Sequence, residues 1–242
     1  MVYFFAEAEN GLKGGAIINI NSKVKRYSTR DYAYEELREQ IIMLKLNPGR
    51  SISENEMSIM LEVSRTPVRE AFVKLAQEKL LEVYPQKGTF VSLIDLDYVE
   101  EARFIREHLE RAIVKEACKS FNVDCLIELE KKFELQKLAV EKKDYTKLFE
   151  LDEMFHQCIS IGTDKERIWS VIQQMNAHLN RIRMLSLAAN YNWELILSQH
   201  EKIIKAIKQQ KEDEADLVME EHLRKLTFEL EELKNEFPDY FK

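Results

Sequence analysis

Glycine and proline are distributed very unevenly along this chain of 242 residues. Beyond Gly88 the sequence holds one glycine, Gly162, and one proline, Pro238. Because these two residue types interrupt helices more than any others, their scarcity predicts that the chain after residue 93 is almost entirely helical. Helices joined by short links pack beside one another in opposite directions, so this part should form an antiparallel bundle.

The helical part divides into segments that begin at capping residues and carry apolar stripes. Asp144, Asp164 and Asn192 stand where N-caps are needed, and Leu129 and Phe133 belong to one buried stripe. We expect about six helices, at residues 95–119, 123–143, 145–161, 164–189, 192–209 and 213–235.

A different pattern precedes the bundle. Ser53 and Glu56 form a capping-box pattern ahead of an apolar run, which predicts a short helix. Ser64 is a good N-cap for a second helix, and Pro67 falls in its first turn, where no hydrogen bond is lost. With an earlier helix over residues 28–46, this predicts a helix-turn-helix.

The second helix of this pair is a candidate recognition helix. Its first turn presents two cations and the Thr66 hydroxyl to solvent, where such a helix meets the edges of bases. The candidate DNA-contacting residues of this turn are Ser64, Arg65, Thr66 and Arg69.

A hairpin is expected directly after the recognition helix. Residues 81–84 and 89–92 are rich in strand-forming residues, and Pro85-Gln86-Lys87-Gly88 between them is typical of a turn. Such a hairpin is a wing, with Lys87 and Gly88 at its tip placed to contact a phosphate or the minor groove. The predicted fold is therefore mainly α, a winged helix-turn-helix followed by an all-α bundle.

The signature residues of this region are Asn47-Pro48-Gly49, Ser53-Glu54, Val63 to Glu70 and Lys87-Gly88-Thr89-x-Val91. The pattern resembles the winged helix of the GntR family of bacterial repressors. This resemblance implies a homodimer that binds a palindromic operator in double-stranded DNA. Glu62 stands where the family commonly has glycine, so a left-handed backbone there would cost about 1 kcal/mol.

Charge and composition agree with a two-part chain. The formal net charge is −7, but residues 1–93 carry a net charge of +1 and the remainder carries −8. A nearly neutral DNA-binding part with a few well-placed cations suits specific binding better than unspecific binding. We expect three segments: an extension at 1–27, a winged helix-turn-helix at 28–93 and a helical domain at 94–242.

The sequence gives no sign of export or membrane insertion. Three cysteines are too few for a disulfide framework, which favours a reducing compartment. The start of the chain lacks the basic flank of a signal peptide, and no apolar run is long enough to span a bilayer. We therefore expect a cytoplasmic protein without a membrane partner.

Histidines are the unusual feature of the predicted bundle. Asp152 and His156 are four residues apart and share a helix face, while His200 and His222 lie at matching depths on the last two helices. One carboxylate and three imidazoles can hold Zn²⁺, Ni²⁺ or Mn²⁺. Taken singly, each histidine would more often be a partly buried residue with satisfied hydrogen bonds than a metal ligand.

A second resemblance bears on these residues. The pattern Asp152-x-x-x-His156, His200-Glu201-x-Ile203 and His222 is similar to the metal-binding motif of the FCD domain, the helical effector domain of the FadR-type branch of the GntR family. It implies that these four residues bind a divalent transition metal.

Two arginines are candidates for binding a small carboxylate effector. Arg106, with Glu110 one turn later, resembles an arginine and glutamate pattern of the same family and could receive a carboxylate. Arg183 is the second candidate. A surface or interhelical salt bridge is the alternative role of Arg106. His108 and His178 have no motif support and are expected to be ordinary helix residues.

Three classes of function were compared. A hydrolytic zinc enzyme would need a nearby general base, and no His-Glu-x-x-His occurs. A di-iron bundle would need a second Glu-x-x-His, and a pure interaction module would not need a winged helix. We therefore expect a transcriptional regulator rather than an enzyme, most simply a repressor controlled by an organic acid, with a metal-dependent bundle enzyme as the alternative.

Overall fold

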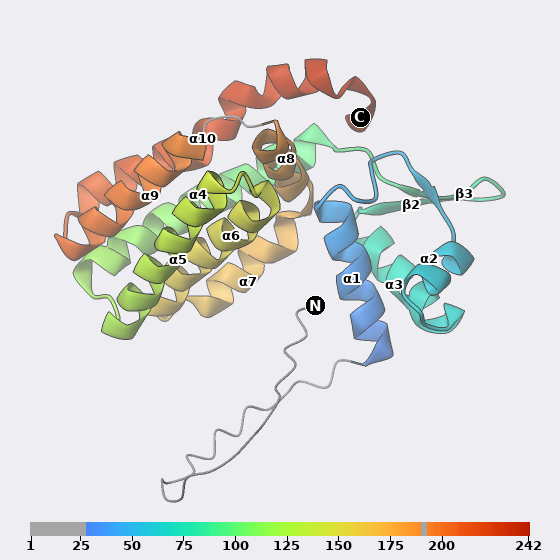
Figure 1. Cartoon of the computed structure of the whole chain (residues 1–242), viewed down its shortest axis with the longest axis horizontal. Helices are drawn as coiled ribbons and strands as arrows, with labels where there is room; N and C mark the ends of the chain where they lie inside the picture. Colours follow the sequence, from blue (N-terminus) through green and yellow to red (C-terminus); the bar gives the residue numbers. More distant parts are fainter. Residues whose placement is uncertain (1–27, 190–192) are drawn as a thin grey trace, which may run out of the picture.

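The computed structural model describes residues 28–189 and 193–242, which form a small winged-helix part and a larger helical bundle (Figure 1). The predicted extension at residues 1–27 and the predicted cap Asn192 lie outside the described residues. Within the described ranges, no helix is both long enough and apolar enough to cross a membrane.

The winged-helix part packs three helices against a small sheet, as predicted. Leu37 of the first helix, and Val68 and Leu75 of the third, have no exposed surface and lie at the centre of its core. Its elements are α1 Thr29–Ile42, β1 Ser51–Ile52, α2 Glu54–Met60, α3 Arg65–Gln77, β2 Leu81–Tyr84 and β3 Gly88–Val91.

The first helix is shorter than predicted. Its N-cap is Ser28, whose hydroxyl accepts the backbone N–H of Asp31 at 3.1 Å. It ends at Ile42, four residues before the predicted end, because the chain turns into a left-handed conformation at Leu44 (φ 57°). Leu44 therefore packs beside the bundle as a link residue rather than as part of a helical stripe.

The two helices of the helix-turn-helix use their predicted caps only in part. The Ser53 hydroxyl accepts the N–H of Glu56 at 3.1 Å, but the Glu56 carboxylate binds Arg50 at 2.7 Å instead of returning to the cap. Ser64 has the backbone conformation of an N-cap, and its hydroxyl makes no capping bond. Glu62 adopts the expected left-handed conformation in the turn (φ 56°).

The wing is an antiparallel hairpin joined by an additional short strand. In the sheet order β1-β3-β2, Leu81 lies opposite Val91 and Tyr84 opposite Gly88. The turn needs positive φ at Gln86 (63°) and at Gly88 (115°), and only the second position is glycine. Strand β1 was not predicted because two residues are too short to show a periodic pattern.

The bundle contains seven helices in the described residues, and in Figure 1 they pack side by side to the left of the winged-helix part. Its elements are α4 Leu96–Lys119, α5 Val123–Glu141, α6 Tyr145–Gly162, α7 Glu166–Met175, α8 Ala177–Ala188, α9 Trp193–Lys208 and α10 Glu212–Glu236. Short links join α5 to α6 and α9 to α10, as an antiparallel bundle requires. A 3-10 turn, Pro238–Tyr240, follows α10.

The predicted helix at 164–189 is wrong in two respects. The structure divides it at Asn176, which ends α7 and precedes α8. Asp164 is not an N-cap: it is the left-handed residue that ends α6 (φ 57°), and Lys165 takes the cap position of α7. No glycine or proline marks either point, because aspartate tolerates the left-handed region and Asn176 keeps an ordinary backbone conformation.

Gly162 is explained by packing. A Cβ atom at this position would lie 2.3 Å from the ring of Phe121 and 3.0 Å from Cys125. Phe121 and Cys125 belong to the link between α4 and α5 and to the start of α5. Glycine therefore allows the end of α6 to approach this link closely.

Candidate DNA-reading surface and metal centre

The candidate DNA-contacting residues lie at two exposed sites of the winged-helix part. Four lie at the start of α3 and two at the tip of the wing. All six are exposed: Ser64, Arg65, Thr66, Arg69, Lys87 and Gly88. The structure thus leaves all six residues open to solvent, and their role in DNA binding stays a prediction.

Arg69 has an ion-pair partner that the sequence did not indicate. Its guanidinium binds both carboxylate oxygens of Glu54, from the start of α2, at 3.0 to 3.2 Å. Hydrogen bonding to Glu54, helped by the charge of its carboxylate, raises the pKa of Arg69. Glu54 therefore fixes the direction of one candidate base-reading side chain across the helix-turn-helix.

The candidate metal ligands come from three helices of the bundle. Asp152 and His156 lie one turn apart on α6, His200 lies on α9 and His222 on α10. One ligand atom from each of the four side chains can be chosen so that all lie within 4.8 Å of one another. We call these four residues the metal quartet.

The Nε2 atoms of the quartet point toward one another. His156 Nε2 lies 3.1 Å from His222 Nε2 and 3.8 Å from a carboxylate oxygen of Asp152. His200 Nε2 lies 3.5 Å from the other Asp152 oxygen. Three ring nitrogens and a carboxylate therefore converge on one small volume inside the bundle.

Each imidazole is oriented by a second side chain at its other nitrogen. The Nδ1–H of His200 donates to Oε1 of Gln136 at 2.7 Å, and that of His222 donates to Oε1 of Gln199 at 3.1 Å. Nδ1 of His156 contacts a carboxylate oxygen of Glu110. Such partners fix the tautomer in which Nε2 is free to bind a metal.

Gln136 is itself held in place. Its amide nitrogen donates to the Leu151 carbonyl at 3.1 Å, which turns the amide oxygen toward His200. Sequence reasoning missed Gln136 and Gln199 because glutamine has no metal-binding signature of its own. The sequence pattern had indicated Glu110 only as a partner of Arg106, not as a partner of His156.

Burial and charge keep Asp152, His200 and His222 in the protonation states that bind a metal. Burial lowers the pKa of His200 to about 3, and burial also lowers the pKa of His222 well below its ordinary value. Burial alone would raise the pKa of Asp152, but Arg183 and the histidines outweigh it and lower that pKa. At neutral pH His200 and His222 are therefore neutral and Asp152 is charged.

The donor set fits a divalent transition metal. His200 Nε2 is fully buried and has no hydrogen-bond partner in the described part of the chain. A buried polar atom without a partner is costly, and a metal ion would satisfy this nitrogen lone pair. Three nitrogen ligands and one oxygen ligand suit Zn²⁺, Ni²⁺ or Mn²⁺.

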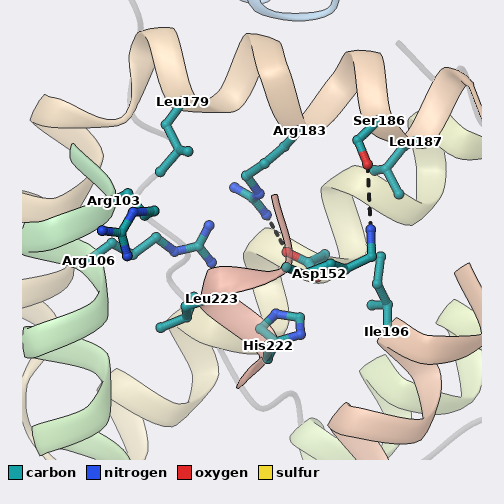
Figure 2. A pocket seen from close by; sticks show the side chains of 11 residues that line it. Arg103, Arg106, Asp152, Leu179, Arg183, Ser186, Leu187, Ile196, His222 and Leu223 are labelled. Carbon is teal, nitrogen blue, oxygen red and sulfur yellow. Dashed lines mark hydrogen bonds and ion pairs between the residues drawn. The ribbon is translucent and has the colours of Figure 1, made fainter. Parts of the chain in front are cut away.

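A pocket opens beside the quartet, and both candidate effector residues line it (Figure 2). Arg183 of α8 points into the pocket and contacts a carboxylate oxygen of Asp152, and it also contacts Glu153. Arg106 of α4 binds Glu110 at 2.5 Å through its Nε atom. This salt bridge is buried and lies within α4, so it is neither the surface nor the interhelical pair expected as the alternative, and Arg106 still lines the pocket.

His178 differs from its predicted role as an ordinary helix residue. It is buried on α8, where Nδ1 accepts the N–H of Asp95 at 3.1 Å and Nε2 lies 3.1 Å from the Lys79 carbonyl. It therefore joins the winged-helix part to the start of the bundle. His108 is exposed on α4, as expected of a residue outside any site.

Comparisons with known proteins agree on both parts of the chain. The family described as "Bacterial regulatory proteins, gntR family" matches residues 29–91, and the FCD domain matches residues 101–225. The chain is 33% identical over 208 residues to the HTH-type transcriptional repressor RspR of Escherichia coli K12, covering 86% of this chain and 91% of that protein. It is 30% identical to the gluconate operon transcriptional repressor of Bacillus licheniformis, over 74% and 75% of the two chains.

Solved structures with the same fold include E. coli McbR/YncC, with a TM-score of 0.74 and 20% identity over 87% of this chain and 99% of that one. A GntR regulator from Rhodococcus has a TM-score of 0.70 and 21% identity over 85% of this chain and 99% of that one. The family and these relatives are transcriptional regulators, not enzymes, which excludes the metal-dependent enzyme considered above. The chain belongs to the GntR family, as a DNA-binding transcriptional regulator with a GntR-type helix-turn-helix and an FCD domain.

Proposed function

We propose that this regulator is a homodimeric repressor whose affinity for a palindromic operator is set by a small organic acid bound at a divalent metal in the bundle. Repression is supported by the names of two relatives, the RspR repressor and the gluconate operon repressor. The metal quartet is the single observation that carries the effector half of the proposal.

The quartet supports a receptor role for the metal. With two neutral imidazoles of depressed pKa, one further imidazole and one carboxylate as ligands, a divalent ion would keep a positive charge of about one unit and open positions for oxygen ligands. Arg183 adds a positive charge beside Asp152. Arg106 Nη2 is buried without a hydrogen-bond partner among the described residues, so it has a donor to offer to a carboxylate.

DNA reading would use the exposed residues of α3 and the wing. Arg65, Thr66 and Arg69 would enter the major groove with the Ser64 hydroxyl near the backbone, while Lys87 and Gly88 would reach the neighbouring minor groove. Residues 1–93, which include the winged-helix part, carry a net charge of only +1, so one copy binds DNA weakly by itself. Two linked copies on adjacent half-sites bind more tightly because of their effective concentration.

Effector control requires that the acid favours one arrangement of the two winged-helix parts. The acid can shift this equilibrium only by its difference in affinity for the two arrangements. Helix α8 is a route for this coupling, because it carries Arg183 at the pocket and His178 at the winged-helix part.

The proposal is tested by selecting an operator from random DNA with the metal-loaded protein and titrating the complex with a panel of small carboxylates. We expect a palindromic site, a dimer by sedimentation at micromolar concentration, and at least one acid that changes operator affinity only when metal is present. A monomeric protein, or a purified protein that holds no divalent metal after supplementation, would contradict it.

A further inference from the structure

A short segment that follows α10 packs on the chain that joins the two parts of the protein. Residues 237–242 continue from α10, form the 3-10 turn Pro238–Tyr240 and then run beside residue 94 (Figure 1). Residues 92–95 connect the wing to α4. We call residues 237–242 the strap and residues 92–95 the interdomain linker.

Backbone hydrogen bonds hold the strap to the interdomain linker. The Ile94 N–H donates to the Tyr240 carbonyl at 2.8 Å, and the Lys242 N–H donates to the Ile94 carbonyl at 3.0 Å. Both backbone polar groups of Ile94 are therefore bonded to the strap, as in a pair of parallel strands. Because Ile94 has no exposed surface, loss of the strap would leave these two groups unpaired until water reached them, which is costly.

Side chains extend the contact on either side of these backbone bonds. Lys242 Nζ donates to Oδ2 of Asp95 at 2.9 Å, and Asp95 also caps α4 by accepting the backbone N–H of Asp97 at 3.1 Å. The aromatic residues of the strap pack against a buried cluster drawn from the linker, α4, α8 and α10; they are Phe237, Tyr240 and Phe241. The strap thus contacts the point at which the bundle begins.

The interdomain linker is bonded from α8 as well. Two side chains of α8 bind backbone groups of Ser92, Leu93 and Asp95. Ile94 lies between these residues and is bonded by the strap. Each of the four linker residues therefore has a backbone bond to the bundle, and the strap supplies those of Ile94.

Helix α10 connects the strap to the metal quartet. The helix runs unbroken from His222 to Glu236, a distance of about 20 Å at the usual helical rise. It contains no glycine or proline that would allow it to bend sharply. A shift of His222 would therefore reach the interdomain linker through one continuous helix.

We propose that the strap holds the winged-helix part in one orientation on the bundle, and that α10 joins this contact to the metal quartet. Two winged-helix parts that are already held in the required orientation bind a palindromic site more tightly, because less freedom is lost on binding. This consequence for DNA binding rests on the proposed function, whereas the contact between strap and linker does not.

Hydrogen exchange tests the strap in the metal-loaded full-length protein. Lys242→Glu places a carboxylate beside Asp95 and changes an exposed side chain, so the fold should be kept. We expect amide exchange in peptides that span residues 92–95 to become about threefold faster or more, and a protein shortened to end at Glu236 should show about tenfold or more. Lys234→Glu makes the same charge change near the end of α10, beside Glu231, and should leave exchange unchanged.

Removing the metal tests the connection through α10. In the parent protein loaded with Zn²⁺, a chelator should speed exchange of the interdomain linker, because His222 is then no longer held by the ion. In the protein that ends at Glu236 the chelator should have no further effect on the linker. An equal effect of the chelator in both proteins would show that α10 and the strap do not carry it.

Operator binding tests the consequence for DNA. The parent should bind a palindromic operator more tightly than DNA with one half-site, and removal of the strap should lower this preference by about tenfold with half-site affinity unchanged. If the shortened protein does not fold, Lys242→Glu serves for both measurements, with a smaller expected change.

The outcomes separate the strap from the proposed function. Unchanged linker exchange in Lys242→Glu and in the shortened protein would overturn the strap, whatever the operator. A full operator preference in a folded protein whose linker exchanges freely would overturn its role in orientation. A parent protein that does not prefer the palindromic site would contradict the proposed homodimeric repressor, and exchange would still decide the role of the strap.

Discussion

Arg181 and Arg183 lie two residues apart on α8 and bind two different parts of the protein. Arg181 donates to the carbonyls of Ser92 and Leu93, between the wing and α4, at 2.6 and 3.3 Å. Arg183 contacts Asp152 of the metal quartet. One short helix is therefore bonded both to the junction below the winged-helix part and to the candidate effector site.

This arrangement predicts that Arg181 couples the effector to DNA binding. Arg181→Lys keeps the charge but cannot make the same fork of hydrogen bonds. We expect a severalfold smaller effect of the best-binding acid on operator affinity, with metal affinity unchanged. Fluorescence anisotropy of labelled operator with and without the acid measures this effect. Arg167→Lys, at an exposed position of α7, is the control. An effect of the acid in Arg181→Lys equal to that in the parent would contradict the coupling role.

The junction should also make stability depend on pH through His178. Burial, helped by the charge of Arg181, lowers the pKa of His178 to about 4. Its Nδ1 accepts from the Asp95 N–H, so protonating Nδ1 in the folded state would remove that bond. Below about pH 6.5 the unfolded chain therefore binds the proton first, and the free energy of unfolding falls as pH decreases toward 4.

The measurement compares the parent protein with His178→Asn, which keeps an acceptor near Nδ1 and does not titrate. We expect the parent to be more stable above pH 6.5 and the difference to shrink between pH 6.5 and 4 in denaturant titrations. A constant difference across this range would show that His178 does not titrate as argued.

We expect the cations of α3 and of the wing to have unequal roles in DNA binding. Arg65→Ala and Arg69→Ala should each weaken the free energy of specific operator binding by about 1 to 3 kcal/mol, as expected for loss of a bidentate contact to guanine. Lys87→Ala should instead weaken binding to all sequences and reduce the salt slope by about one unit. Binding measured at several salt concentrations distinguishes the two effects.

Lys131→Ala is the control for this series, because Lys131 is an exposed cation on α5 whose surface ion pair with Glu128 should contribute little. If Arg65→Ala and Arg69→Ala both bound the operator as tightly as the parent, the recognition helix would be wrongly assigned.

Much of this architecture could be predicted because helix breakers and helical spacing, which are local properties of the sequence, determine it. The scarcity of glycine and proline indicated the bundle, and the spacing of Asp152 and His156 placed them on one helix face. The break at Asn176 could not be predicted, since its backbone is ordinary and no helix breaker stands there.

The missed residues act through tertiary contacts that leave no sequence pattern. Gln136 reaches His200 across 64 residues, and His178 binds backbone groups of Lys79 and Asp95. A backbone partner has no residue type that could mark it, so His178 was indistinguishable from an ordinary helical histidine.

The metal quartet gives the most direct prediction. His200→Ala or His222→Ala removes a ligand and should lower metal affinity by about a hundredfold or more, since changes at partners of the ligands already cost about 10 to 100-fold. Gln136→Ala should lower metal affinity by about 10 to 100-fold, because it keeps the His200 ligand but leaves its ring free to rotate. Metal content by elemental analysis and competition with a chelator measure these affinities.

His108→Ala is the matched control, because His108 is an exposed histidine of the bundle outside the quartet. Operator binding without effector should survive in all four variants that stay folded, because none of the four residues lies in the winged-helix part. The response to the acid should disappear together with the metal in His200→Ala and His222→Ala and remain in His108→Ala. A His200→Ala protein that still responds normally to the acid would show that the effector does not bind at a metal held by these residues.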